Sequence, residues 1–302
     1  MSLSLCLWSK GQLRRKAVEL GAVAVGFARA EEVERSVREG YEAWIAEGCH
    51  GEMAYLAKYG DVRFNPRQLL AGAKTVVCMA FPYRPAGGYH HPLIADYALG
   101  EDYHTVLKSR LYELAHFAAE NFGGQSRPCV DTAPLPERYW AWKAGLGWIG
   151  LNHQLIVPGV GSGVFLAELI TTLELEPDQP LAGDCGKCGR CIARCPGRAL
   201  SKNGKFDARC CLSYLSIEHR GPLPSEPRLG SHIYGCDECQ KACPHNACEP
   251  PEPLGEFAPD TRLLSLDREA LASLTPSDWR RLTAKSAKKR VKLAQIKRNL
   301  HA

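Results

Sequence analysis

The segment Cys185-Gly-Lys-Cys188-Gly-Arg-Cys191-Ile-Ala-Arg-Cys195-Pro196 determines how the rest of the chain can be interpreted. Three cysteines at intervals of two residues, then a fourth after three residues and a proline, form the ligand spacing of paired 4Fe-4S clusters. In that arrangement the first three thiolates bind one cluster and the fourth binds its neighbour. The segment therefore predicts two clusters that pass electrons one at a time.

A second run, Cys236-x2-Cys239-x3-Cys243-Pro244, begins 41 residues after Cys195 and has the same ending. Ile233 stands where its first cysteine would be expected, and Cys211 is the obvious substitute. With Cys211 included, each cluster has four cysteine ligands. Cluster 1 would use Cys185, Cys188, Cys191 and Cys243, and cluster 2 would use Cys195, Cys211, Cys236 and Cys239.

Two other ligand arrangements are compatible with parts of this pattern. A pair of zinc sites would also use C-x2-C pairs, but zinc needs neither the third cysteine nor a repeated Cys-Pro ending. Among the spare cysteines, Cys248 is the one that could compete as a ligand, because it follows the second Cys-Pro closely. Cys210 adjoins Cys211 and is not expected to be a ligand.

Composition places this chain of 302 residues among ordinary globular proteins, with 45% hydrophobic and 24% charged residues. Its 14 cysteines do not indicate a secreted disulfide scaffold, because they lie in ligand spacing and no secretory signal is recognised. The uncharged stretch 144–167 is rich in glycine, so a membrane-spanning helix is not expected there. A reducing cytoplasm fits thiolate ligands.

The net charge of +5 is concentrated near the C-terminus. From Trp279 onward there are nine Lys or Arg residues and no Asp or Glu, so the preceding 278 residues carry −4, which is the total less these nine. Such a segment favours a polyanionic partner, RNA first, with Lys288, Lys289 and Arg290 as candidate contacts. A solvated terminal helix explains the same charge equally well.

Hydrophobic periodicity divides the chain into three parts. Residues 1–180 alternate between helix and strand, residues 181–253 hold the cysteine runs, and residues 254–302 are helical and basic. Strands are expected at 22–28, 74–83, 127–131, 154–158 and 164–175, and helices at 12–20, 31–47, 103–122 and 135–144.

Several segments outside the cysteine runs resemble the epoxyqueuosine reductases, the cobalamin-dependent iron–sulfur enzymes of tRNA queuosine synthesis. The most specific are Val130-Asp-Thr-Ala-Pro134 and Ala144-Gly-Leu-Gly-Trp-Ile-Gly150, which both precede the cysteine runs. Further matching segments are 50–53, 102–104, 211–215 and 233–240. The resemblance covers nearly the whole chain.

The resemblance implies an α+β fold: a nitroreductase-like α/β cobalamin domain, a ferredoxin-like module with two 4Fe-4S clusters, and a short basic helical C-terminus. It implies reduction of epoxyqueuosine to queuosine at the wobble position of a tRNA. The expected partners are the anticodon loop of that tRNA and an external electron donor such as flavodoxin or ferredoxin, and we expect a monomer. Longer members of the family continue into a helical-repeat domain, so this chain resembles the short form.

The resemblance places the proton donor for the departing epoxide oxygen on Asp131. The ordinary pKa of an aspartic acid is about 3.9. The pKa of Asp131 would therefore have to be raised for this residue to act as an acid at neutral pH. An apolar pocket could raise it by disfavouring the anion. Its candidate walls are Pro134, Leu135, Trp140 and Trp148. Alternatively, Asp131 caps a helix that begins near Pro134.

Candidate cobalamin contacts are mainly polar side chains and glycines of the matching segments. The glycines would let the backbone approach the macrocycle, although a helix C-cap and turn would use them too. An axial histidine is not predicted, because Leu107 stands where the D-x-H-x-x-G motif would place glycine after Asp102 and His104. His153 and the pair His90–His91 are also not expected to be ligands. The candidates are Arg63, Tyr97, Asp131, Arg138, Gly147, Gly150 and Asn152.

Two other functions remain open at this point. A reductive dehalogenase-like cobalamin and iron–sulfur reductase would usually carry an export signal and different acid residues. A non-catalytic electron carrier with two clusters would not need 180 residues of α/β domain ahead of its cysteines.

Overall fold

A four-stranded antiparallel sheet with the order β1-β2-β6-β3 lies at the centre of the structure, a computed structural model that describes residues 3–84 and 91–302. Two short strands pair separately with each other. The prediction for His90 falls outside the described residues. The strands are β1 (Ala24–Arg29), β2 (Thr75–Pro82), β3 (Ser126–Cys129), β4 (Trp148–Ile149), β5 (Leu155–Ile156) and β6 (Val164–Thr171).

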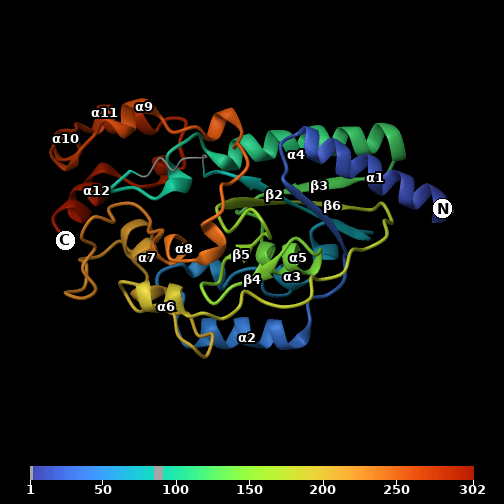
Figure 1. The fold of residues 1–302 in the computed structure, drawn as a ribbon, viewed down its shortest axis with the longest axis horizontal. Coiled ribbons are helices and arrows are strands. Elements are labelled where there is room, and N and C mark those ends of the chain that lie inside the picture. Colours follow the sequence, from blue (N-terminus) through green and yellow to red (C-terminus); the bar gives the residue numbers. More distant parts are fainter. Residues whose placement is uncertain (1–2, 85–90) are drawn as a thin grey trace.

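Helices cover both faces of the sheet. On one face lie α1 (Leu3–Glu19) and α4 (Tyr103–Phe122), and on the other lie α2 (Arg35–Ala46), α3 (Gly60–Phe64) and α5 (Glu137–Lys143) (Figure 1). Within the described residues no helix is both long and apolar enough to cross a membrane. Strand β2 is buried along its whole length, as a sheet covered on both faces requires.

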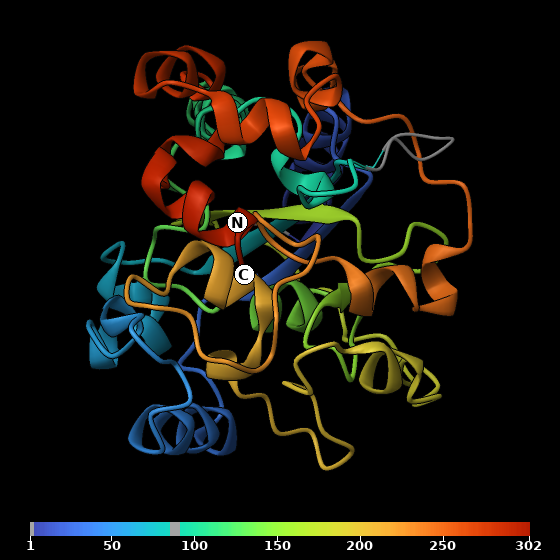
Figure 2. The same ribbon diagram turned by 90° about the vertical axis from the view of Figure 1, so that its left-hand side faces the viewer.

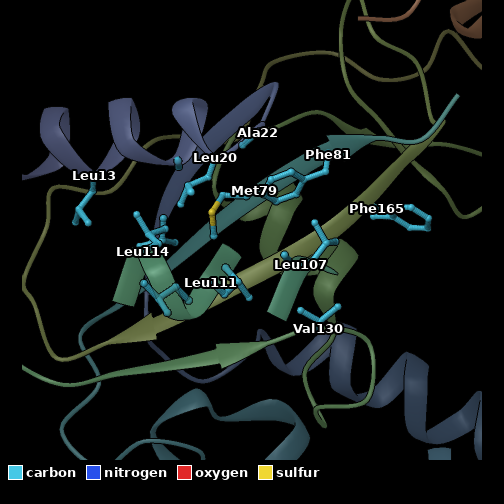
Figure 3. Close-up of a cluster of buried hydrophobic side chains, with 14 of the residues drawn as sticks. Leu13, Leu20, Ala22, Met79, Phe81, Leu107, Leu111, Leu114, Val130 and Phe165 are labelled. Carbon is cyan, nitrogen blue, oxygen red and sulfur yellow. The ribbon is translucent and has the colours of Figure 1, made fainter. Parts of the chain in front are cut away.

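The side chains of β2 alternate between two cores, which follows from the two-residue period of a strand. Met79 and Phe81 face α1 and α4 (Figure 3), whereas Cys78 and Ala80 belong to the core on the α5 side. Helix α4 contributes apolar residues at helical spacing to the first core, and this packing fixes the position of its N-terminal end. They include Leu107, Leu111 and Leu114.

The cysteine module and the C-terminal helices lie together at one end of the sheet in both views (Figure 1, Figure 2). They share a hydrophobic core with residues 93–99, which belong to the predicted N-terminal domain. This shared core does not test the predicted domain boundaries, which stay a prediction. The helices are α6 (Arg190–Arg194), α7 (Leu212–Ile217), α8 (Glu238–Lys241), α9 (Thr261–Leu264), α10 (Arg268–Ser273), α11 (Pro276–Thr283) and α12 (Leu293–Leu300). Short 3-10 turns include η3 (Asp96–Ala98), η4 (Ala208–Cys210) and η7 (Ala287–Arg290).

Most predicted elements are present with shifted ends. The helix at 103–122 is confirmed, and its start is set by Asp102, which caps it by accepting a hydrogen bond from the His104 N–H. Helix α1 begins well before residue 12, and α2 is shorter than 31–47. The strand predicted at 127–131 ends at Cys129, because Asp131 has a left-handed backbone with φ 50°.

Candidate active site

A cleft of about 1490 Å³ lies where the start of α4, the loop after β3, α7 and η7 meet. Ordinary small-molecule sites measure about 300–1,000 Å³, so this cleft has room for a larger ligand. Four of the seven predicted cobalamin contacts line it: Arg63, Tyr97, Asp131 and Arg138.

Asp131 stands on a three-residue turn at the edge of this cleft. The Thr132 N–H donates to the Val130 carbonyl, and the Asp131 N–H donates to Oε1 of Glu137. The Asp131 side chain is 46% exposed. It does not cap α5, because the N-cap position is Pro136 and no side chain accepts a capping bond there. The capping alternative for Asp131 is therefore wrong.

His104 links Asp131 to a second carboxylate. Its Nε2 lies 2.8 Å from Oδ2 of Asp131, and its Nδ1 lies 2.7 Å from Oδ1 of Asp102. Oδ2 of Asp102 in turn pairs with Nζ of Lys289 at 2.7 Å. Tyr103 stacks on the imidazole with ring centroids 4.1 Å apart and so fixes the ring plane. The result is a continuous Asp131–His104–Asp102–Lys289 chain.

Among the linked side chains, the imidazole of His104 carries the proton, and the carboxyl group of Asp131 does not. Burial opposes a charged histidine, but hydrogen bonds to Asp102 and Asp131 outweigh it and raise the pKa of His104 to about 9. Burial likewise disfavours the Asp131 anion, yet the hydrogen bond and charge of His104 hold the pKa of Asp131 below its ordinary value. The expectation of a raised pKa for Asp131 is therefore wrong, because its neighbour is a cation and not only an apolar wall.

Three of the predicted cobalamin contacts do not line the cleft. A Cβ on Gly147 would stand 2.0 Å from the Ile156 carbonyl oxygen, and one on Gly150 would stand 2.7 Å from Oδ1 of Asn152. These two glycines are therefore explained by close approach of the chain to itself. Asn152 is buried beside the first cysteine set, and its Oδ1 accepts from the Gln154 N–H.

The basic C-terminal residues separate into two kinds. Lys288 is only 1% exposed, and its ammonium donates to the Ala98 carbonyl and to the Ser286 hydroxyl. Burial lowers its pKa to about 8. The prediction that Lys288 contacts RNA is therefore wrong, since its charge is enclosed. Lys289 and Arg290 line the cleft, and Arg290 also pairs with Glu218.

The four cysteines predicted for cluster 1 line one small cavity. Cys188 is exposed, Cys185 is half-buried and Cys191 is buried. Cys243 comes from the second run but lies with this set. Burial raises the pKa of its thiol, and the nearby charges of Cys188 and Cys185 raise it further. The crossing of Cys243 into the first run therefore agrees with the ligand assignment predicted from the spacing.

The four cysteines predicted for cluster 2 also converge. Burial, then the charges of Cys236, Cys211 and Cys195, raise the pKa of the Cys239 thiol. Within the described part of the chain, no three His, Cys, Asp or Glu side chains are grouped as a site for one metal ion. Cys211 also lines the cleft, so this set adjoins Asp131's cavity.

Cys210 and Cys248 are the spare cysteines that lie nearest the ligand runs in the sequence. Cys210 interacts with Cys195 and with the adjacent Cys211, and its other neighbours are Asp207 and Arg209. Cys248 is exposed, and its thiol donates to the His245 carbonyl.

Sequence reasoning missed three titratable residues at this site. His104 was considered only as a metal ligand, and Glu137 was given no role. Glu168 is completely buried in β6, where it pairs with Cys129, two residues before Asp131. A single acidic residue within the apolar stretch 164–171 was the one available signal for it.

Two family models match the chain. One, described as "Epoxyqueuosine reductase QueG, DUF1730", matches residues 63–132, and the other, described as "4Fe-4S double cluster binding domain", matches residues 184–246. An epoxyqueuosine reductase of Gloeobacter violaceus is 39% identical over 299 residues, which cover 95% of this chain and 93% of the relative. The chain belongs to the epoxyqueuosine reductase family. It is therefore an oxidoreductase with an iron–sulfur module.

Further relatives agree with this membership. An epoxyqueuosine reductase of Salmonella typhimurium is 37% identical over 290 residues, which cover 92% of this chain and 75% of the longer relative. Among solved structures, an epoxyqueuosine reductase with an epoxyqueuosine-modified tRNA-Tyr stem loop superimposes with a TM-score of 0.87. That structure is 29% identical, and the match covers 96% of this chain and 79% of the other.

Proposed function

We propose that this family member reduces epoxyqueuosine to queuosine at the wobble position of a tRNA, with cobalamin in the cleft and electrons from two 4Fe-4S clusters. Two electrons and two protons convert the epoxide into a carbon–carbon double bond and water. The observation that carries the proposal is that one cleft is lined by Asp131, His104 and Cys211. A proton source and a cluster ligand thus meet at a cavity large enough for cofactor and substrate.

The residues of the cleft fit a large polar cofactor. Nε of Arg63 is buried and has no partner within the described structure, and Tyr97 and Arg138 line the same cavity. A buried donor without an acceptor is costly, so a ligand rich in amide oxygens would satisfy it. Cobalamin would supply a cobalt that accepts single electrons and passes them to carbon. One-to-one binding by the anaerobically reconstituted protein, followed in the visible spectrum, tests this fit, and its absence would contradict it.

Electrons would enter through cluster 1 and leave through cluster 2, because Cys188 is exposed while Cys211 lines the cleft. The stretch 185–206 carries six Lys or Arg residues and no Asp or Glu, which suits an acidic carrier such as flavodoxin or ferredoxin. We place this reaction in the cytoplasm and expect a monomer. The exposed cations of this stretch include Lys187, Arg190, Arg198 and Lys202.

Asp131 would deliver the proton to the departing oxygen, and His104 would replace it. The imidazolium donates to both carboxylates, so a proton can move from Nε2 to Oδ2 of Asp131 as Asp131 protonates the substrate. Asp102 holds the imidazole in place and stabilises its charge, and Lys289 pairs with the other carboxylate oxygen of Asp102.

His104→Gln tests this arrangement through the pH dependence of turnover. In the unaltered protein, turnover should fall as pH rises through about 9, since His104 then loses its proton. The glutamine variant should turn over about 100-fold more slowly at neutral pH and should lack that alkaline fall. His116→Gln, an exposed position on α4, is the matched control. An unchanged pH profile in the His104 variant would exclude His104 from proton delivery.

The cleft lining also suits RNA. It carries six Lys or Arg residues against three Asp or Glu, and its exposed tyrosines offer rings on which unpaired bases can stack. The relative solved with a tRNA stem loop supports the same partner. The cations are Arg63, Lys108, Arg127, Arg138, Lys289 and Arg290, and the tyrosines are Tyr55, Tyr59 and Tyr112.

Alanine at both Lys289 and Arg290 should weaken tRNA binding at low salt. Each cation lost should also reduce the slope of log affinity against log salt by about one. Arg35→Ala, on an exposed side chain away from the cleft, should leave both quantities unchanged. Fluorescence anisotropy with a labelled anticodon stem loop over a salt series measures them. Equal slopes for the double variant and the unaltered protein would show that these residues do not contact RNA.

A further inference from the structure

Glu168 is an unusual residue for the middle of a buried strand. It is 0% exposed, and within the described structure no hydrogen-bond donor reaches either of its carboxyl oxygens. Its neighbours across the sheet are Cys78 on β2 and Cys129 on β3. Both belong to the apolar core on the α5 side, so neither offers a countercharge. An ionised carboxylate in such a place would be very costly.

Glu137 is the residue that reaches Glu168. It occupies the first turn of α5, one helical turn before the buried Trp140, and its carboxyl group lies within hydrogen-bonding reach of Glu168. Its Oε1 also accepts the N–H of Asp131. Glu137 therefore joins the buried carboxyl group in β6 to the backbone of the catalytic turn.

Two carboxylates in contact cannot both be ionised here. Burial, and then the charge of the partner carboxylate and of Asp131, raises the pKa of Glu168, and burial with the charge of Asp131 raises that of Glu137. The facing charged groups are Asp131 and Arg138, and only Arg138 is a cation. A proton on one carboxyl group would supply the donor that the pair otherwise lacks.

We propose that Glu137 and Glu168 share one proton and together form a latch for the turn that carries Asp131. Glu168 donates this proton to one oxygen of Glu137, and the other oxygen of Glu137 accepts the Asp131 N–H. The latch holds Asp131 at its left-handed φ of 50°, a backbone conformation that aspartate adopts only at some cost. Glu137 and Glu168 are thus positioning residues, and this inference rests on the proposed role of Asp131 as proton donor.

Infrared difference spectroscopy tests the shared proton without any turnover. At neutral pH the reconstituted protein should show the carbonyl stretch of a protonated carboxylic acid, with the expected shift in D2O. Glu168→Gln should remove this band, whereas Glu174→Gln, an exposed glutamate just beyond β6, should keep it. Persistence of the band in Glu168→Gln, or its absence from the unaltered protein, would overturn the shared proton whatever the substrate proves to be.

The latch itself is tested at Glu137. Glu137→Ala should lower kcat about 100-fold with little change in KM, because Asp131 is displaced and the cleft is not. Glu137→Gln should recover most of that loss, since its amide oxygen still accepts the Asp131 N–H. Thermal unfolding of both variants separates loss of the fold from loss of position. Equal kcat values for the alanine and glutamine variants, both folded, would overturn the latch.

Discussion

Asp131→Asn should abolish epoxide reduction while cobalamin and both clusters stay bound. Asparagine has nearly the same shape and tolerates a left-handed backbone, and the Glu137 latch uses only the backbone N–H of residue 131. What the variant loses is the carboxyl group that passes the proton from His104. We expect turnover to fall by about 10²–10⁴-fold, the usual contribution of a general acid.

Two measurements separate this chemical loss from a structural one. Iron content and the visible spectrum report the clusters and cobalamin, and nucleoside analysis of the tRNA reports turnover. Asp61→Asn, at an exposed surface position, is the matched control and should behave as the unaltered protein. Turnover near the unaltered rate in Asp131→Asn would remove Asp131 from the mechanism.

Cys211→Ala should cost cluster 2, whereas Cys210→Ala should not. Cys211 adjoins Cys239 and Cys236, whereas Cys210 interacts with Cys195 and with its neighbour Cys211. With its fourth ligand gone, cluster 2 should be lost or degraded, iron content should fall by about half, and electrons should no longer reach the cleft. Because Cys210 and Cys211 are adjacent in the sequence, their two alanine variants are a closely matched pair.

Iron analysis and electron paramagnetic resonance of the reduced variants measure this effect. Cys243→Ala should disturb cluster 1 and the surrounding module, because Cys243 comes from the second run but lies with Cys185 and Cys188. A Cys210→Ala variant that loses iron while Cys211→Ala keeps it would reverse the ligand assignment.

The grouping of the cysteines could be predicted from the sequence because a cysteine run is a local motif, and their binding of clusters stays a prediction. Spacing alone indicated that Cys195 and Cys243 cross between the two sets, and the structure places each of them accordingly. The helix at 103–122 was equally accessible, since its apolar period and its cap at Asp102 are both local.

The surroundings of Asp131 could not be predicted, because they are assembled from distant segments. His104 comes from the start of α4, Glu168 from β6 and Lys289 from η7, and no local pattern relates them. The same limit explains the error at Lys288, whose charge looks like part of a basic surface until packing encloses it. Acid chemistry at Asp131 stays a prediction, but the expected direction of its pKa shift was wrong, because that pKa depends on a neighbour 27 positions away.

Nucleoside analysis of a tRNA that carries epoxyqueuosine tests the central claim most directly. The protein would be reconstituted with iron, sulfide and cobalamin without oxygen, then supplied with a low-potential reductant. We expect queuosine to form in proportion to the protein that holds cobalamin, and to be lost in Asp131→Asn. Unchanged epoxyqueuosine, with cobalamin bound and both clusters reduced, would contradict the proposed function.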